Sequence, residues 1–224
     1  MKNRYYIRSH LTERQFREVV RLFCLDVCAL TTASILHLNK NTTNAIFQKL
    51  RVRLVQLSLE ESAPFTGEIE VDESYFGSRR IRGKRGRGAG GKIPVVGLLK
   101  RGGSVYVKIV EDCSKASLQP IIRGQVVSSS TLYTDGWSGY DGLILDGYKH
   151  HRVHHHENEF ARGKNHINGI ESFWSFAKLR MSKKRGILRK NFLSHLLECQ
   201  WRWNHRHQNS FQILIQNLVD FPLN

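Results

Sequence analysis

The hydrophobic pattern of the chain changes at Gly67, and this change constrains the fold more than any other feature. From Thr12 to about Glu61, apolar residues recur every three to four positions, as in amphipathic helices. After Gly67 they alternate with polar residues or form short β-branched runs, as in strands. The sequence therefore predicts a small helical part followed by a larger part that contains a sheet.

The part after Gly67 is predicted to be α/β. Its patterns indicate three strands, a helix, two further strands and two helices, in that order. This order favours a mixed sheet layered with helices. The predicted strands are residues 68–76, 94–100, 105–111, 131–134 and 150–154, and the predicted helices are residues 114–127, about 167–181 and about 191–205.

Residues 1–62 are predicted to form a small all-α domain, and residues 67–210 the α/β domain. A break between the second and third predicted helices precedes a helix whose exposed face would carry Lys49, Arg51 and Arg53. This arrangement resembles a helix-turn-helix DNA-binding element. A plain three-helix packing module is the alternative.

The charge of the chain indicates a polyanionic partner. Its 35 Lys and Arg against 19 Asp and Glu give a formal net charge of +16, and cations that neutralise phosphates release condensed counterions. The charge is uneven: residues 63–77 sum to −4, whereas residues 78–92 and residues 163–224 each sum to +7. An acidic island beside basic stretches suits an enzyme that needs carboxylates for metal ions and cations for a nucleic-acid backbone.

Two cationic runs are candidates for contact with phosphates. Residues 78–92 hold seven cations and five glycines and no acid, and a second run lies around residue 184. A solvated loop is the plain interpretation of the first run, but a block of like charge favours phosphate contact. The predicted DNA contacts in the two runs are Arg79, Arg80, Arg82, Lys84, Arg85, Arg87, Lys183, Lys184 and Arg185.

Three acidic residues are candidates for metal-dependent chemistry. Asp72 lies on the polar face of strand 68–76, whereas Glu73 points with the apolar set. Asp135 ends a short strand, where α/β proteins place ligands. Glu171 stands alone on a helix whose neighbours are basic or aromatic. Taken singly, Asp72 fits the wet face of an edge strand equally well, and Asp135 fits a simple turn.

Taken together, three motifs resemble those of the ISXO-like DDE transposases of bacterial insertion sequences. They follow the family's order over residues 67–206, which is most of the chain. The motifs are Glu70-Val-Asp72-Glu-Ser-Tyr-Phe-Gly77, Tyr133-Thr-Asp135-Gly-Trp-Ser-Gly-Tyr140 and Asn168-Gly-Ile-Glu171-Ser-Phe-Trp-Ser-Phe-Ala-Lys178.

The resemblance implies an RNase H-like fold and a metal-dependent site. Asp72, Asp135 and Glu171 would bind two Mg²⁺ ions, with Mn²⁺ as a substitute. The implied activity is binding of terminal inverted repeats, strand nicking and transfer of the freed 3′-hydroxyl into target DNA. The implied partners are double-stranded DNA and further copies of the chain, because two ends must be paired.

The resemblance also implies DNA-contacting residues. Lys178 matches the basic residue that touches the DNA end, Asn168 belongs to the same motif, and His155 is the nearest match to a family histidine. Many relatives begin with a Cys-rich zinc-ribbon segment, which this sequence lacks. Recognition of the DNA end is therefore expected to rest on residues 1–62.

Other interpretations stay open at this point. An RNase H-like nuclease or resolvase would use the same acids without joining, and a DNA-binding regulator would need none of them. Six of the eleven histidines lie between His150 and His166, where a zinc site is the alternative to a DNA-facing run.

No apolar stretch reaches the length of a membrane span, so we expect no association with a membrane. We expect a cytoplasmic protein that is associated with the nucleoid when bound to DNA. Cys24 and Cys28 are expected on a buried face.

Overall fold

The computed structural model describes residues 3–77, 91–153, 166–184 and 186–224. The chain divides into two compact units. One comprises Met1–Glu60 together with Asn204–Asn224, and the other comprises Glu61–Trp203. The C-terminal residues thus belong with the N-terminal helices rather than with the sheet.

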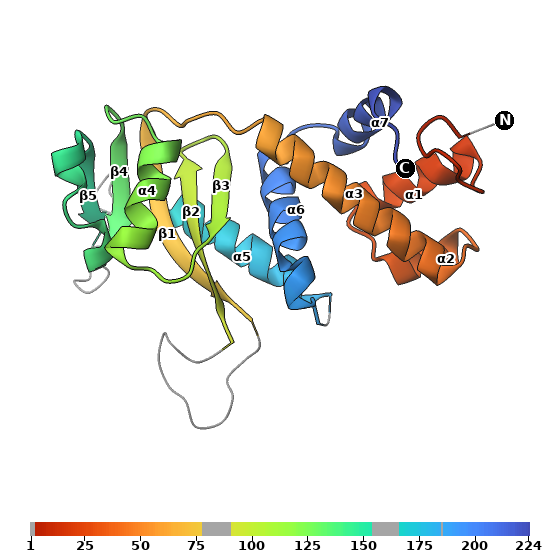
Figure 1. The fold of residues 1–224 in the computed structure, drawn as a ribbon, viewed down its shortest axis with the longest axis horizontal. Helices are drawn as coiled ribbons and strands as arrows, with labels where there is room; N and C mark the ends of the chain where they lie inside the picture. The colour runs from red at the N-terminus through yellow and green to blue at the C-terminus, as the bar shows by residue number, and fades with distance from the viewer. Residues whose placement is uncertain (1–2, 78–90, 154–165, 185) are drawn as a thin grey trace. The chain divides into compact units, whose positions relative to one another are not determined.

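A mixed sheet forms the centre of the second unit. Within the described residues it has five strands in the order β3-β2-β1-β4-β5 (Figure 1). The pairs β1–β2 and β2–β3 are antiparallel, whereas β4 runs parallel to β1, and β5 runs parallel to β4. The strands are β1 (Glu68–Phe76), β2 (Ile93–Lys100), β3 (Val105–Ile109), β4 (Thr131–Asp135) and β5 (Lys149–Val153).

Helices cover both faces of this sheet. Successive side chains of β1 point to opposite faces of the sheet, so their contacts identify the helix that covers each face. Ile69 packs in a buried apolar cluster with Leu118 of α4. The next residue, Glu70, accepts a hydrogen bond from the backbone N–H of Ile170 in α5. In Figure 1, α4 lies in front of the sheet and α5 behind it. The helices of this unit are α4 (Lys115–Gln125), α5 (Asn168–Ser182), α6 (Phe192–Asn204) and the short 3₁₀ helices η1 (Ser138–Tyr140), η2 (Leu143–Asp146) and η3 (Arg189–Asn191).

The first unit is a helical bundle with its own apolar core. Its first helix begins with a capping box, in which Thr12 Oγ1 accepts from the backbone N–H of Gln15 and the Gln15 side chain accepts from that of Thr12. The helix buries Phe16, Val20 and Phe23 at three-to-four spacing, as its sequence pattern predicts. The helices of this unit are α1 (Glu13–Cys24), α2 (Ala29–Ile35), α3 (Lys40–Glu60) and α7 (Ser210–Asp220).

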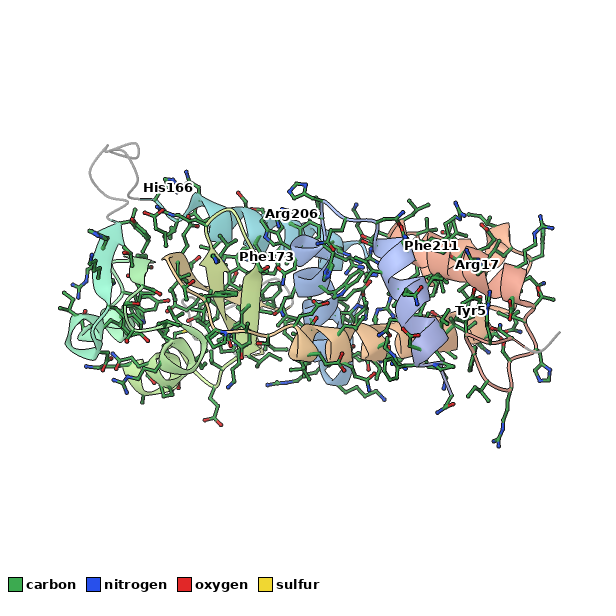
Figure 2. The ribbon with its side chains drawn as sticks, turned by 90° about the horizontal axis from the view of Figure 1, so that it is seen from above. Tyr5, Arg17, His166, Phe173, Arg206 and Phe211 are labelled. Atoms are coloured by element: carbon green, nitrogen blue, oxygen red, sulfur yellow. The ribbon has the colours of Figure 1, made fainter. Side chains whose placement is uncertain are left out.

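An arginine between two aromatic rings joins α7 to this bundle. Arg17 of α1 donates to the hydroxyl of Tyr5 at 2.8 Å, and its guanidinium lies 5.5 Å from the ring centre of Phe211 in α7 (Figure 2). Such cation–π contacts let an arginine bury its stem and keep its charge.

The α/β prediction with a mixed sheet is confirmed, and the described architecture is consistent with an RNase H-like fold. The first strand has the predicted bounds, residues 68–76. Two expectations are wrong. The chain ends with α7 after the two expected helices. Cys28 is exposed, and its Sγ caps α2 by accepting from the backbone N–H of Thr31.

Candidate active site

Carboxylates converge where strand β4 ends. Residue pairing between β1 and β4 runs as far as Val71 and Thr134, so the next residues, Asp72 and Asp135, lie side by side at the end of β4. One carboxylate oxygen each from Asp72, Glu73 and Asp135 lie within 4.8 Å of one another. We refer to these three residues as the acidic cluster.

Asp72 is the most constrained member of the acidic cluster. Its Oδ2 accepts a hydrogen bond of 3.1 Å from Nε1 of Trp174 in α5. Burial raises the pKa of Asp72 to about 6, and the negative charges of Asp135 and Glu171 act in the same direction. Glu171 therefore lies within electrostatic reach of Asp72. It sits in the first turn of α5, with its side chain exposed.

Glu73 is a member of the acidic cluster that is not among the residues predicted for the site. The alternation of β1 predicts that Glu73 points with the apolar residues. The structure agrees in part, because Glu73 lies beside Tyr140, a fully buried member of the apolar cluster beneath α4. Nevertheless the carboxylate reaches Asp72 and Asp135. Burial raises the pKa of Glu73 to about 7, with the charges of these two aspartates adding to the effect and the Tyr140 hydroxyl opposing it. The feature of the sequence that could have indicated Glu73 is that it directly follows another acid, Asp72.

A buried ion pair holds the start of α5 against the sheet. Glu70 is 1% exposed, and its Oε1 accepts from Nε of Arg101 at 3.0 Å. The other oxygen, Oε2, accepts from the backbone N–H of Ile170 at 2.9 Å and so satisfies a free donor of the first helical turn. A Cβ on Gly169 would lie 2.8 Å from the same Oε2. The glycine therefore permits the close approach that places Glu171 near Asp72.

A second close contact fixes Trp174. Its indole ring covers Gly97 of β2, where an added Cβ would lie 2.6 Å from Trp174 Cζ2. Phe76 packs against the same ring, with ring centres 5.9 Å apart. Trp174 is 4% exposed, so it is a core side chain that also donates to Asp72.

Two predicted DNA contacts lie on α5. Asn168 is its first residue and is exposed. Lys178 is exposed as well, and its Nζ lies 5.9 Å from the ring centre of Phe76, near the end of β1. Lys178 and Glu171 are both exposed on α5, seven residues apart.

Several predicted contacts lie outside the residues that the structure describes. They include the cations of residues 78–90, namely Arg79, Arg80, Arg82, Lys84, Arg85 and Arg87, together with His155 and Arg185. Of the neighbouring cations, Lys183 is exposed and Lys184 half-buried at the end of α5.

The expectation that α3 exposes three cations is wrong for Arg51. Arg51 is 9% exposed, with its guanidinium 5.9 Å from the ring centres of Phe23 and Phe47. Lys49 and Arg53 are half-buried. Lys49 donates to the backbone carbonyl of Asn224. One ring from α1 and one from α3 itself thus cover a cation that was expected in solvent.

The donor set of the acidic cluster suits a hard divalent cation. Magnesium and manganese bind carboxylate oxygens, and their charge would offset both the burial of Asp72, which is the main cause of its raised pKa, and the repulsion from Asp135 and Glu171. Among the described residues, this is the one group of three or more acidic, His or Cys side chains close enough to hold a metal ion together.

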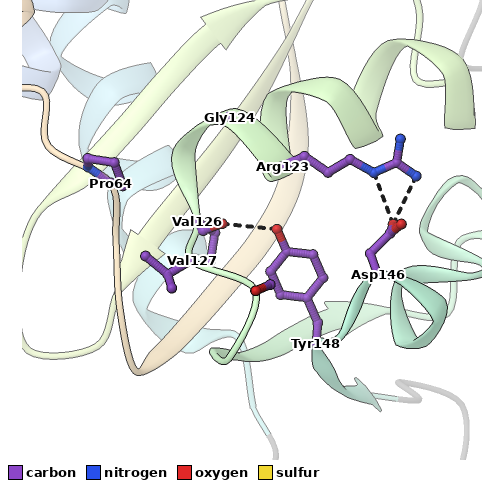
Figure 3. Close-up of a pocket in the computed structure, with 8 residues that line it drawn as sticks. Pro64, Arg123, Gly124, Val126, Val127, Asp146 and Tyr148 are labelled. Carbon is purple, nitrogen blue, oxygen red and sulfur yellow. Dashed lines mark hydrogen bonds and ion pairs between the residues drawn. The ribbon is translucent and has the colours of Figure 1, made fainter.

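A separate hollow on this unit does not involve the acidic cluster. It has a volume of about 430 Å³ and is lined by Pro64, Arg123, Gly124, Val126, Val127, Ser128, Asp146 and Tyr148 (Figure 3). Its charged side chains are already paired, because Arg123 donates to Asp146 at 2.9 Å. The Tyr148 hydroxyl donates to the Val126 carbonyl. We assign no function to it.

No helix within the described ranges combines the length and the apolar character needed to cross a membrane.

Comparison with known proteins gives consistent results. Residues 64–204 match the family model of the ISXO2-like transposase domain. An uncharacterized transposase-like protein of Haemophilus influenzae is 38% identical over 115 residues, which is 51% of this chain and 93% of that protein. An uncharacterized protein in the transposable element ISH50 of Halobacterium salinarum is 30% identical over 169 residues, which is 68% of this chain and 58% of that protein. The matched range of the family model contains the acidic cluster and Glu171.

Proposed function

The chain belongs to the ISXO2-like transposase family, and on that premise we propose that it moves an insertion sequence by DNA strand cleavage and joining. It binds the terminal inverted repeats of its element, nicks the DNA there and joins the freed 3′-hydroxyl to target DNA. Both steps are in-line phosphoryl transfers. The proposal rests on family membership and on one observation, the convergence of Asp72 and Asp135, with Glu171 in electrostatic reach.

The carboxylates hold divalent metal ions in this proposal. Asp72, Asp135 and Glu171 are the ligands, and Mg²⁺ is the physiological ion with Mn²⁺ as a substitute. When bound, a pair of such ions activates the attacking oxygen and stabilises the leaving oxygen. Burial raises the pKa of Asp72, the negative charges of Asp135 and Glu171 add to this effect, and the same negative charges favour a divalent cation at the site.

The remaining side chains orient the acids and hold the DNA. Trp174 orients Asp72 by its hydrogen bond, and Glu70 holds the helix that carries Glu171. Lys178 and Asn168, exposed on the same helix, contact the DNA end. The cations of residues 78–92 and of residues 183–185 hold the phosphate backbone largely without regard to base sequence.

Recognition of the end is assigned to the N-terminal helices, and the active assembly to more than one copy. Of the three α3 cations expected to contact DNA, Lys49 and Arg53 are half-buried and remain partly accessible. Two DNA ends must be brought together before joining, so the proposal includes a homo-oligomer on DNA.

The test compares the wild-type protein with Glu171→Gln and Glu111→Gln. Glu111 is an exposed acid beyond the end of β3 and serves as a matched control. Each protein is incubated with a labelled duplex that carries the element's end, and with a plasmid target, in Mg²⁺ or in EDTA. We expect joined product in Mg²⁺ with wild type and Glu111→Gln, at least a hundredfold less with Glu171→Gln, and none in EDTA. Loss of a metal ligand removes transition-state stabilisation of this order.

The other outcomes separate the competing functions. Cleavage without joining would favour a nuclease or resolvase. Binding of DNA without cleavage would favour a regulator. Loss of DNA binding in Glu171→Gln would assign Glu171 a structural role and contradict the proposed one.

A further inference from the structure

A buried carboxylate oxygen in the acidic cluster has no hydrogen-bond donor within the described residues. It is Oε1 of Glu73. Burying a charged oxygen without a donor is costly, and such an atom in a native fold requires a partner. Besides burial, the groups that act on the pKa of Glu73 are the Tyr140 hydroxyl, the carboxylates of Asp135 and Asp72, and its own backbone N–H.

The neighbouring hydroxyl belongs to Tyr140, which is 0% exposed. It acts on Glu73 as a hydrogen-bond donor that lowers the pKa of this carboxyl, although the contact does not have the geometry of a regular hydrogen bond. Within the described residues, Oε1 of Glu73 therefore has no hydrogen bond of regular geometry. A cation among these carboxylates would satisfy Oε1 directly.

The strand arrangement lets Glu73 reach the same point as Asp72 although the two side chains leave opposite faces of β1. Strand β4 ends at Asp135, whereas β1 continues as far as Phe76. Beyond Asp72, the β4 side of β1 therefore has no pairing partner in β4. An ion at this open edge is accessible from both faces of the strand. The distances agree, because oxygens of Glu73, Asp72 and Asp135 lie within 4.8 Å of one another.

We propose that Glu73 is itself a metal ligand of the active site and binds a divalent cation together with Asp72 and Asp135. The inference rests on the proposed metal-dependent function. It adds a fourth carboxylate to the site. Glu171, which is exposed on α5, approaches from the helix side, whereas Glu73 approaches from the side of Tyr140.

The experiment measures binding of Mn²⁺ to the full-length protein by the electron paramagnetic resonance signal of the free ion. Wild type is compared with Glu73→Gln, Glu73→Asp and Asp72→Asn, and with Glu111→Gln as the matched control. We expect Glu73→Gln and Asp72→Asn each to weaken Mn²⁺ binding at least about tenfold, because each loses a ligand atom. Glu111→Gln should stay within twofold of wild type.

Glu73→Asp separates ligation from simple charge attraction. It keeps the negative charge but draws the carboxylate back by one methylene. If Glu73 is a ligand, Mn²⁺ binding weakens in this variant too, and the two substitutions give Mn²⁺ a smaller stabilising effect on thermal unfolding than in wild type. Thermal unfolding without metal also verifies that both variants are folded.

Three results would overturn the inference. Wild-type affinity in Glu73→Gln, with Asp72→Asn impaired, would remove Glu73 from the site and leave the proposed function intact. If Glu73→Asp binds Mn²⁺ with wild-type affinity while Glu73→Gln does not, Glu73 attracts the ion by its charge and is not a ligand. Absence of Mn²⁺ binding in the wild-type protein, with and without the DNA end, would overturn the inference together with the metal-dependent function.

Discussion

At the scale of single residues, folding disfavours the ionised form of two carboxyl groups in the site. Asp72 and Glu73 are both largely buried beside Asp135, and burial with mutual repulsion raises the pKa of Asp72 to about 6 and that of Glu73 to about 7. The folded protein therefore binds protons on these carboxyls more strongly than the unfolded chain does. Without metal, ionisation of the site costs stability.

The sign of the resulting pH dependence follows by linkage. A raised pKa in the folded state means that this contribution to stability is fully present below the ordinary pKa of 3.8 and is lost as the pH rises through about 6. In EDTA, Asp72→Asn should therefore increase the free energy of unfolding at pH 8 by about 1–3 kcal/mol and leave it nearly unchanged at pH 4. Urea denaturation at the two pH values measures this, with Glu111→Gln as the control. Equal effects at both pH values, or a loss of stability at pH 8, would contradict the assigned cause.

At the scale of elements, the position of Glu171 depends on how α5 begins. Within the described residues no side chain caps its N-terminus from the preceding residue, Ile167. Instead Glu70, from the middle of β1, accepts from the N–H of Ile170 while it pairs with Arg101. A carboxylate at a helix N-terminus is also favoured by the helix dipole. The strand that carries Asp72 thus also fixes the helix that carries Glu171.

Removing the charge of Glu70 should loosen this connection. Glu70→Gln leaves Arg101 without its closest carboxylate and weakens the cap of α5, so we expect a loss of about 2–4 kcal/mol in the free energy of unfolding. Amide hydrogen exchange should accelerate most in the first turn of α5. Glu68→Gln is the matched control, because Glu68 is 41% exposed and lies 3.7 Å from Arg101, and it should cost less than about 1 kcal/mol. Equal losses in the two variants would show that Glu70 does not hold α5 specifically.

At the scale of the whole molecule, the dominant property is its charge of +16. A protein of this charge binds nucleic acid with a strong dependence on salt, because each phosphate contact releases counterions. In the proposed function, Lys178 makes one of these contacts beside the active site. Lys108, exposed on the edge strand β3, serves as a comparison because β3 and β4 lie on different sides of β1 in the sheet.

The salt dependence of binding tests this contact. A plot of log affinity against log salt concentration for the DNA end should become less steep by about one in Lys178→Ala. The slope for Lys108→Ala should match that of wild type. An unchanged slope in Lys178→Ala, or an equal reduction in both variants, would exclude a specific phosphate contact by Lys178.

Local patterns in the sequence predict most of the helices and strands and their order, although not α7. Strand β1 has its predicted bounds because the alternation of residues 68–76 is a local property of the chain. Asp72, Asp135 and Glu171 are selected by the resemblance of three motifs to a family, because the alternation of residues 68–76 alone indicates a polar face rather than Asp72 in particular. The amphipathic pattern of α7, with Leu214 and Leu218 buried, was equally local and was overlooked.

Which side chains contact one another depends on how the helices and strands pack, and this is seen in the tertiary structure alone. Glu73 joins the acidic cluster because β4 ends beside Asp72. The sequence of β1 alone does not predict where its partner strand β4 ends. Arg51 is buried because the rings of Phe23 and Phe47 cover it, which helical periodicity cannot foresee. Glu70 caps a helix that begins a hundred residues later. In each case at least one of the contacts joins segments that are distant in sequence, so the local pattern alone does not predict the arrangement.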